Sequence, residues 1–210
     1  TIFGDSPYQP SSGCAGNIYF IDLDKLVDEG LLEKEEILEY NWGTDESEID
    51  YAALHQNRCK ILQKAFERFD TNAQEFQDFV KKQSEWLEQY ALFMTLKTDN
   101  LYKNWSEWPS EYRNTQTVAL EKYQKKNYNT ITFWKFCQYK FFEQWENLKN
   151  YANSKGVYII GDISFYVGYD SVDVWAERQL FMMSANDTPE YVAAAGPDKY
   201  SESGQGQSNV

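Results

Sequence analysis

Apolar and polar positions follow a helical period through the middle of the chain. Apolar residues recur three or four positions apart in successive groups: Ile61, Leu62, Ala65, Phe66 and Phe69, then Phe76, Phe79 and Val80, then Trp86, Leu87, Tyr90 and Ala91. Between Gly43 and Gly156 there is no glycine, and Pro109 is the one proline. Because the two strongest helix breakers are nearly absent, this stretch is predicted to form long helices.

The pattern also indicates where some helices begin and end. A long helix is predicted from about Thr132 to Ala152, with Gly156 as its stop. Asn72 followed by Glu75 is typical of a capping box and is predicted to begin the helix that contains Phe76. Residues 22–29 are predicted to form a short helix that Asp22 or Asp24 caps and Gly30 ends.

The two flanks read differently. Residues 1–16 are rich in glycine, proline and serine and are predicted to form an irregular loop, and the chain from Pro189 onwards is also predicted to be loop. Asp170 and Asp173 stand at the start of another short helix. The favoured interpretation is that they supply an N-cap and a negative charge at the positive end of the helix dipole.

A short apolar run, Val157–Ile160, follows the last long helix and ends at Gly161 and Asp162. Such a run is typical of a buried parallel strand in an alternating α/β fold. A carboxylate at the carboxyl end of such a strand lies where barrel enzymes keep functional groups. The alternative is that Asp162 caps a turn.

Charge narrows the classes of partner. The chain has 210 residues, and 33 acidic against 20 basic side chains give a net charge of −13. This surface would repel nucleic acids and anionic membranes, so neither is expected as a partner. Aromatic residues make up 17% of the chain, which favours an aromatic core over ligand-stacking surfaces.

Cysteine and histidine usage predicts no metal site. Cys14, Cys59 and Cys137 are widely spaced, which suits buried thiols in a reducing compartment better than a disulfide framework. His55 is the one histidine, and a plain surface or core histidine is favoured.

Several short motifs occur in one order over nearly the whole chain: Gly4-Asp5-Ser6-Pro7-Tyr8-Gln9, Gly161-Asp162-Ile163, Asp170-Ser171-Val172-Asp173-Val174-Trp175 and Ser201-Glu202-Ser203-Gly204-Gln205. Together they resemble the 4-α-glucanotransferases, the amylomaltase or disproportionating-enzyme family of the α-amylase clan. The chain is interpreted as an internal fragment of such an enzyme.

The resemblance implies an α/β fold: a partial (β/α)8 TIM barrel with a large all-helical insertion, mostly α in this fragment. Residues 1–43 would supply a barrel loop and a short helix of the cleft. Residues 44–152 would form the helical insertion. Residues 153–210 would supply the third barrel strand, the following helix and the start of a lid loop.

The implied activity is transfer of α-1,4-glucan segments between maltooligosaccharides, with retention through a covalent glycosyl-enzyme. Retention uses two carboxylates about 5 Å apart. Both are expected outside these 210 residues, so no catalytic residue is assigned and the fragment alone is expected to be inactive. No metal or organic cofactor is expected. The resemblance implies a cytoplasmic setting, with a plastid as the alternative, in starch, glycogen or maltose metabolism.

The resemblance assigns substrate binding to Ser6, Tyr8, Asp162, Asp198, Ser201 and Gln205. Ser6 and Tyr8 would line the sugar cleft, and Asp162 would hydrogen-bond the sugar at the cleavage point. Asp198, Ser201 and Gln205 would lie on the lid. The sequence departs from the family at Ser164, where proline is usual, and at Lys199-Tyr200, where an aromatic pair is usual. The family's tryptophan after Gln205 is also absent.

Two other functions stay open at this point. The chain would serve as a non-catalytic α-glucan-binding module if the same aromatic residues bound glucan without cleaving it. It would be an acidic, helix-rich protein-interaction domain if those aromatic residues belonged only to the core.

Overall fold

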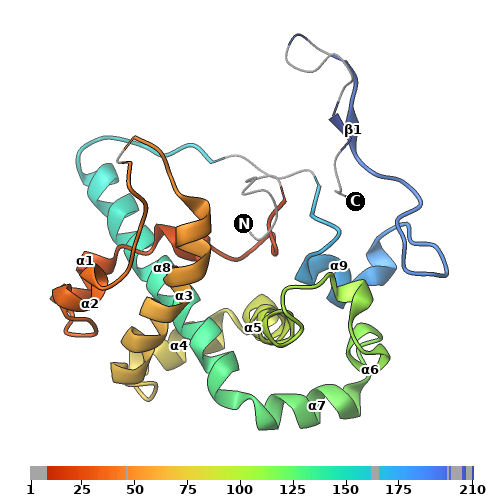
Figure 1. The fold of residues 1–210 in the computed structure, drawn as a ribbon, viewed down its shortest axis with the longest axis horizontal. Helices are drawn as coiled ribbons and strands as arrows, with labels where there is room; N and C mark the ends of the chain where they lie inside the picture. Colours follow the sequence, from red (N-terminus) through yellow and green to blue (C-terminus); the bar gives the residue numbers. More distant parts are fainter. Residues whose placement is uncertain (1–8, 46, 162–165, 198, 200–204, 207–209) are drawn as a thin grey trace. The chain divides into compact units, whose positions relative to one another are not determined.

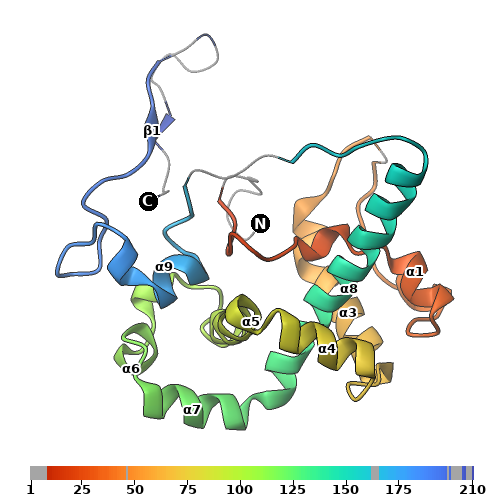
Figure 2. The same cartoon turned by 180° about the vertical axis from the view of Figure 1, so that it is seen from behind.

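The computed structural model describes residues 9–45, 47–161, 166–197, 199, 205–206 and 210. These residues are mostly helical (Figures 1 and 2). The chain divides into two compact units. Gly16–Leu87 and Thr132–Ile160 form one, here called the helical unit. The described parts of Thr1–Ala15, Glu88–Ile131 and Gly161–Val210 form the other, the loop-bearing unit.

The helical unit holds most of the longer helices. In chain order it contains η1 (Ile18–Phe20), α1 (Leu23–Asp28), α2 (Lys34–Leu38), α3 (Tyr51–Arg68), α4 (Gln74–Lys82), the first turn of α5 (Ser84–Asp99) and most of α8 (Tyr128–Ser154). In both views α3, α4 and α8 lie side by side (Figures 1 and 2).

Aromatic rings from α3, α4 and α8 form the core of the helical unit. The ring of Phe69, just after α3, lies 5.3 Å from that of Phe76 and 4.8 Å from that of Phe136. Tyr139, one turn further along α8, lies 5.6 Å from Phe76. The aromatic content of the chain therefore does build a core here, as the composition favoured.

The loop-bearing unit is made of short elements around the rest of α5. They are η2 (Trp105–Glu107), α6 (Ser110–Arg113), α7 (Thr117–Lys126), the start of α8, α9 (Val172–Ala176), η3 (Arg178–Leu180), β1 (Ala194–Ala195) and β2 (Gln205–Gly206). The two strands pair antiparallel, with Ala195 opposite Gln205. The predicted C-terminal loop therefore contains a short β-ladder.

The long-helix predictions are confirmed and one cap prediction is wrong. Helix α8 covers the predicted range and ends at Ser154, and Gly156, whose φ is 76°, lies in the turn that follows. Asp22 caps α1 by accepting a hydrogen bond from the Asp24 amide. The N-cap of α4 is Ala73, with no side-chain cap, in place of Asn72. The Asn72 amide instead donates to the Asp70 carboxylate, because a turn at residues 70–73 precedes the helix.

The predicted buried strand at Val157–Ile160 is not formed. The four residues have no strand or helix assignment, and the exposed fractions of Tyr158 and Ile160 are 80% and 95%. A strand needs a neighbour to satisfy its backbone groups. Within the described ranges, the paired segments (β1 with β2, and Met183 with Pro189) all lie elsewhere.

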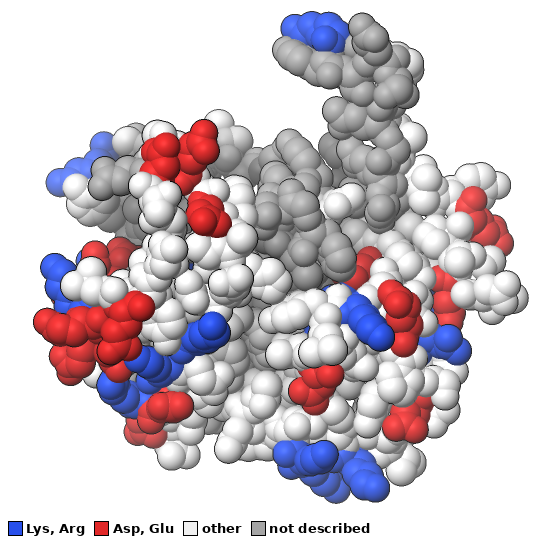
Figure 3. Space-filling model, viewed as in Figure 1, with Lys and Arg blue, Asp and Glu red and all other residues white. Residues whose placement is uncertain are grey.

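Surface charge is unevenly distributed. Lys122, Lys125 and Lys126 form a small basic group on α7, and carboxylates gather over α1 and α2 (Figure 3). His55 is an exposed residue of α3. None of the helices described has the length and apolar content needed to cross a bilayer.

All three cysteines are free thiols, but they are not all buried. Cys137 is buried and Cys59 is half-buried, as predicted, whereas Cys14 is exposed. Burial raises the pKa of Cys59 to about 11. Cys14 differs because it belongs to an irregular surface segment, residues 9–15.

Candidate functional site

Five of the six predicted substrate-binding residues, Ser6, Tyr8, Asp162, Asp198 and Ser201, lie outside the described residues. Of the sixth, Gln205, the backbone is described as part of β2. Described residues close to these positions in the sequence show which segments of the chain meet. All of the flanks belong to the loop-bearing unit.

The segment after Tyr8 lies against the segment that follows Asp162. A Cβ on Gly168 would stand 3.2 Å from the Pro10 carbonyl oxygen, so the absence of a side chain there permits the close approach. The Val172 amide donates to the Ser11 carbonyl at 2.9 Å. The Gly13 amide donates to the Asp173 carboxylate at 3.0 Å.

The end of the predicted lid segment returns to the same place. The Val210 amide donates to the Val167 carbonyl at 3.0 Å, and the Val167 amide donates back at 3.4 Å. Tyr8 is one residue from its anchor at Gln9. Asp162 is five residues before Val167, and Gln205 is five before Val210. Five residues span at most about 18 Å. The described flanking segments themselves meet at one junction, at Val167 and Gly168.

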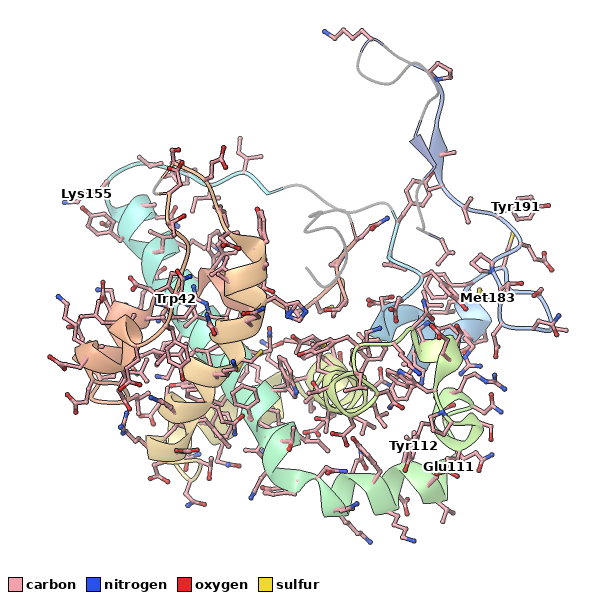
Figure 4. The ribbon with its side chains drawn as sticks, in the orientation of Figure 1. Trp42, Glu111, Tyr112, Lys155, Met183 and Tyr191 are labelled. Atoms are coloured by element: carbon pink, nitrogen blue, oxygen red, sulfur yellow. The ribbon has the colours of Figure 1, made fainter. Side chains whose placement is uncertain are left out.

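Helix α9, which follows Val167 and Gly168 in the chain, is held by its N-cap and by a buried tryptophan. The Ser171 hydroxyl caps α9 by accepting a hydrogen bond from the Val174 amide at 3.3 Å. The buried Trp175 ring packs 5.7 Å from Phe93, and its indole N–H donates to the Tyr112 carbonyl at 3.0 Å. Tyr112 lies on α6, as Figure 4 shows. Because α9 is held at its N-cap and at Trp175, its first turn can position the segment that contains Ser11 and Gly13.

Asp170 does not cap α9 as predicted; it forms a buried ion pair with Lys97 of α5. The exposed fractions of the two side chains are 8% and 0%. Asp170 also accepts from the Trp105 amide at 3.2 Å, and Lys97 donates to the Lys103 carbonyl at 2.8 Å. Burial raises the pKa of Asp170 and lowers the pKa of Lys97, and the opposite charge of the partner resists each shift.

A second network fixes the chain on either side of α9. The Trp105 indole donates to the Tyr169 carbonyl at 2.7 Å, and the Arg178 guanidinium lies 4.6 Å above the Trp105 ring. Arg178 also binds the Asp187 carboxylate at 2.9 Å, while the Tyr169 hydroxyl donates to the Asp187 carbonyl at 2.6 Å. Asp187 belongs to the turn that Met183 and Pro189 bridge, and Figure 4 labels Met183.

The sequence reasoning missed Lys97, Trp105 and Arg178 as supports of this junction. Lys97 is 73 residues from Asp170, and nothing in local spacing links them. One signal was available: a lysine inside an otherwise apolar run of α5 requires a buried partner. In the part of the chain described here, no three His, Cys, Asp or Glu side chains are grouped as metal ligands.

Comparisons with known proteins agree on one family. The sequence model of a family described as 4-alpha-glucanotransferase matches residues 1–208. A 4-alpha-glucanotransferase of Clostridium butyricum is 40% identical over 207 residues, which are 98% of this chain and 42% of that protein. A 4-alpha-glucanotransferase of Streptococcus pneumoniae is also 40% identical, over 98% of this chain and 41% of its own length. The chain thus spans about two fifths of these relatives.

Solved structures give the same result. An amylomaltase from Streptococcus agalactiae in complex with acarbose superposes with a TM-score of 0.91 at 36% identity, over 99% of this chain and 42% of that one. An amylomaltase from Corynebacterium glutamicum, at 20% identity and a TM-score of 0.62, is similar in fold alone.

Proposed function

Since the family model covers residues 1–208, the chain belongs to the 4-alpha-glucanotransferase family, and we propose that the full-length protein transfers α-1,4-glucan segments between maltooligosaccharides. The observation that carries the proposal is this match across nearly the whole chain, joined by relatives at 40% identity. The reaction breaks one α-1,4 bond and forms another, with retention through a covalent glycosyl-enzyme. The nucleophile and the acid/base carboxylate lie outside these 210 residues.

The part of the enzyme contributed by this chain is one side of the glucan cleft. Ser6 and Tyr8 line the sugar-binding cleft, and Asp162 binds the sugar at the cleavage point. Asp198, Ser201 and Gln205 lie on the lid loop that closes over the glucan. Convergence of the three flanking segments at Val167 and Gly168 supports this assignment. The ring of Tyr8 would stack on a sugar face while its hydroxyl bonds a sugar hydroxyl. Asp162 would accept hydrogen bonds from sugar hydroxyls.

In the full-length protein this chain forms part of a (β/α)8 barrel. Residues 1–43 and 153–210 belong to the barrel and its loops, and residues 44–152 form the helical insertion. Exposed apolar side chains at Val157–Ile160 support a third-strand position, because an unpaired strand leaves its faces and edges open until neighbouring strands cover them. Similarity to the Streptococcus agalactiae amylomaltase supports the same architecture.

The setting proposed is the cytoplasm, in starch, glycogen or maltose metabolism, without a metal or organic cofactor. The three free thiols suit a reducing compartment. The net charge of −13 argues against nucleic acid or an anionic membrane as a partner. The acarbose complex of the Streptococcus agalactiae protein supports α-glucan-like ligands for this one.

Steady-state kinetics of the full-length protein on maltotriose test the proposal. Asp162→Ala should lower kcat/KM on the order of 100-fold, because it removes hydrogen bonds at the cleavage point. Tyr8→Ala should raise KM, because it removes a stacking face. Tyr151→Ala, which truncates a tyrosine with 64% exposure on α8, is the matched control and should keep the wild-type constants.

Three outcomes would contradict the proposal. If the wild-type protein forms no glucose from maltotriose, the activity is wrong. If the wild-type protein binds maltooligosaccharides without converting them, the protein is a non-catalytic glucan-binding protein. If both variants match wild type, the residue assignments are wrong while the activity stands.

A further inference from the structure

The Asp173 side chain contacts the segment after Tyr8 from the segment around α9. The same two segments are also joined by the backbone hydrogen bond between Val172 and Ser11 and by the close approach of Gly168 to Pro10. The Asp173 Oδ2 atom accepts from the Gly13 amide across 160 residues of sequence. Truncating the Asp173 side chain therefore removes this contact without altering the backbone.

The acceptor is held in place by α9. Asp173 is the second residue of the helix, between Val172 and Val174, whose exposed fractions are 5% and 0%. The Ser171 cap fixes the turn that carries it. Burial raises the pKa of Asp173, and the hydrogen bond from Gly13 opposes that shift, so the carboxylate is partly desolvated and turned toward the loop.

The donor is held in place by Ser12. The buried Ser12 hydroxyl accepts from the amides of Cys14 and Ala15 at 3.1 and 3.2 Å. This local turn uses the amides on the far side of Gly13 and leaves the Gly13 N–H for Asp173. A Cβ on Gly13 would stand 3.6 Å from the Asp173 Oδ1 atom, an ordinary contact distance. Donor and acceptor are both positioned by their own elements before they meet.

We propose that Asp173 is a positioning residue for the glucan cleft: its hydrogen bond to Gly13 holds residues 9–15, the segment that follows Tyr8, against residues 166–176, the segment that follows Asp162. The inference rests on the proposed function. Tyr8 is five residues from Gly13, and its anchor Gln9 lies beside Gly168. Release of Gly13 frees one end of residues 9–15, so this segment must be ordered again each time sugar binds.

The kinetic test compares three variants of the full-length protein on maltotriose. Asp173→Ala removes the acceptor and should raise KM about tenfold with kcat within about twofold, the factor expected for one hydrogen bond to a charged group. Asp173→Asn keeps a carbonyl oxygen in the same place and should restore KM to within about twofold of wild type. Glu85→Ala removes an exposed acidic residue from the second position of α5, in the helical insertion, and should change neither constant.

A merely structural role for Asp173 would lower the amount of active enzyme, and with it kcat, and would leave KM unchanged. That result for Asp173→Ala overturns the proposal. The proposal is also overturned if Asp173→Asn raises KM as much as Asp173→Ala does. That result would mean that KM depends on the negative charge in the first turn of α9 and not on the hydrogen bond.

Amide hydrogen exchange without sugar separates this proposal from the proposed function. The peptide covering residues 9–15 should exchange faster in Asp173→Ala than in wild type, and Asp173→Asn should stay close to wild type. Unchanged exchange in Asp173→Ala overturns the contact whatever the enzyme does. If exchange responds as expected while wild type does not act on maltotriose, the proposed function fails and the anchoring contact stands.

Discussion

Two aspartates three residues apart have different roles at the start of α9. Asp173 reaches the loop after Tyr8, and Asp170 turns into the protein to pair with Lys97. The sequence pattern assigned both to the helix start, because short-range spacing carries no information about a lysine on a distant helix. Ser171, between them, is the residue that caps the helix. The observed N-cap, Ser171, is thus one residue after Asp170, which the pattern assigned to the helix start.

The Lys97–Asp170 pair should be strongly coupled. Lys97→Met or Asp170→Asn alone leaves a buried charge without its partner and should cost about 3–5 kcal/mol. The double variant should cost clearly less than the sum, because no charge remains unpaired. Denaturant unfolding, followed by tryptophan fluorescence, gives the free energy of unfolding of wild type, the two single variants and the double variant. Additive costs would mean that the two side chains do not depend on each other.

The Arg68–Glu36 pair links stability to acid pH. Hydrogen bonds from Arg68, at 2.6 and 3.0 Å, and from the Glu33 amide lower the pKa of Glu36 to about 2. The ordinary pKa of glutamate is about 4.3. The pair therefore stabilises the fold fully above that value, and this contribution is lost as the pH falls toward 2.

Glu36→Gln should accordingly lower Tm at pH 6 by about 2 °C, the range expected of a surface ion pair, and by less at pH 3. Calorimetry at the two pH values measures the difference. Glu35→Gln, on the same helix but exposed, is the control and should alter Tm equally little at both. If Glu36→Gln lowers Tm as much at pH 3 as at pH 6, ionisation of Glu36 does not account for the stabilisation.

At the scale of elements, hydrophobic period predicted the helices well and the strand poorly. Helices α3, α4, α5 and α8 follow the apolar positions at Ile61 to Phe69, Phe76 to Val80, Trp86 to Ala91 and Phe133 to Leu148. A helix satisfies its own backbone, so its pattern is readable locally. A strand at Val157–Ile160 needs a partner segment, which local pattern cannot supply.

The aromatic core of the helical unit gives a direct stability prediction. Phe76 is 1% exposed and touches Phe69 and Tyr139. Phe76→Ala should cost about 3–5 kcal/mol, because it removes a buried ring and leaves a cavity. Phe20→Ala truncates a ring that is 76% exposed and should cost less than about 0.5 kcal/mol. Denaturant midpoints of the two variants measure the contrast, and equal midpoints would refute this core.

At the scale of the whole molecule, the family was recognised from ordered motifs and not from composition. The Gly161-Asp162-Ile163 and Asp170–Trp175 motifs carry that recognition, and the match over residues 1–208 agrees with it. The anchoring of the site was less predictable. Asp173 meets Gly13, and Val210 meets Val167, only after the chain has folded. The sequence motifs identified the candidate substrate-binding residues. The contacts that hold the neighbouring segments in place were found only in the three-dimensional structure.

The central claim is that the full-length protein containing this chain transfers glucan segments and does not hydrolyse them. The most direct test incubates it with maltotriose and follows glucose, longer glucans and total reducing ends over time. Transfer breaks one glycosidic bond and makes one, so we predict that glucose and longer glucans appear while total reducing ends stay constant. Glucose that appears with a matching rise in reducing ends, or no glucose at all, would contradict the claim.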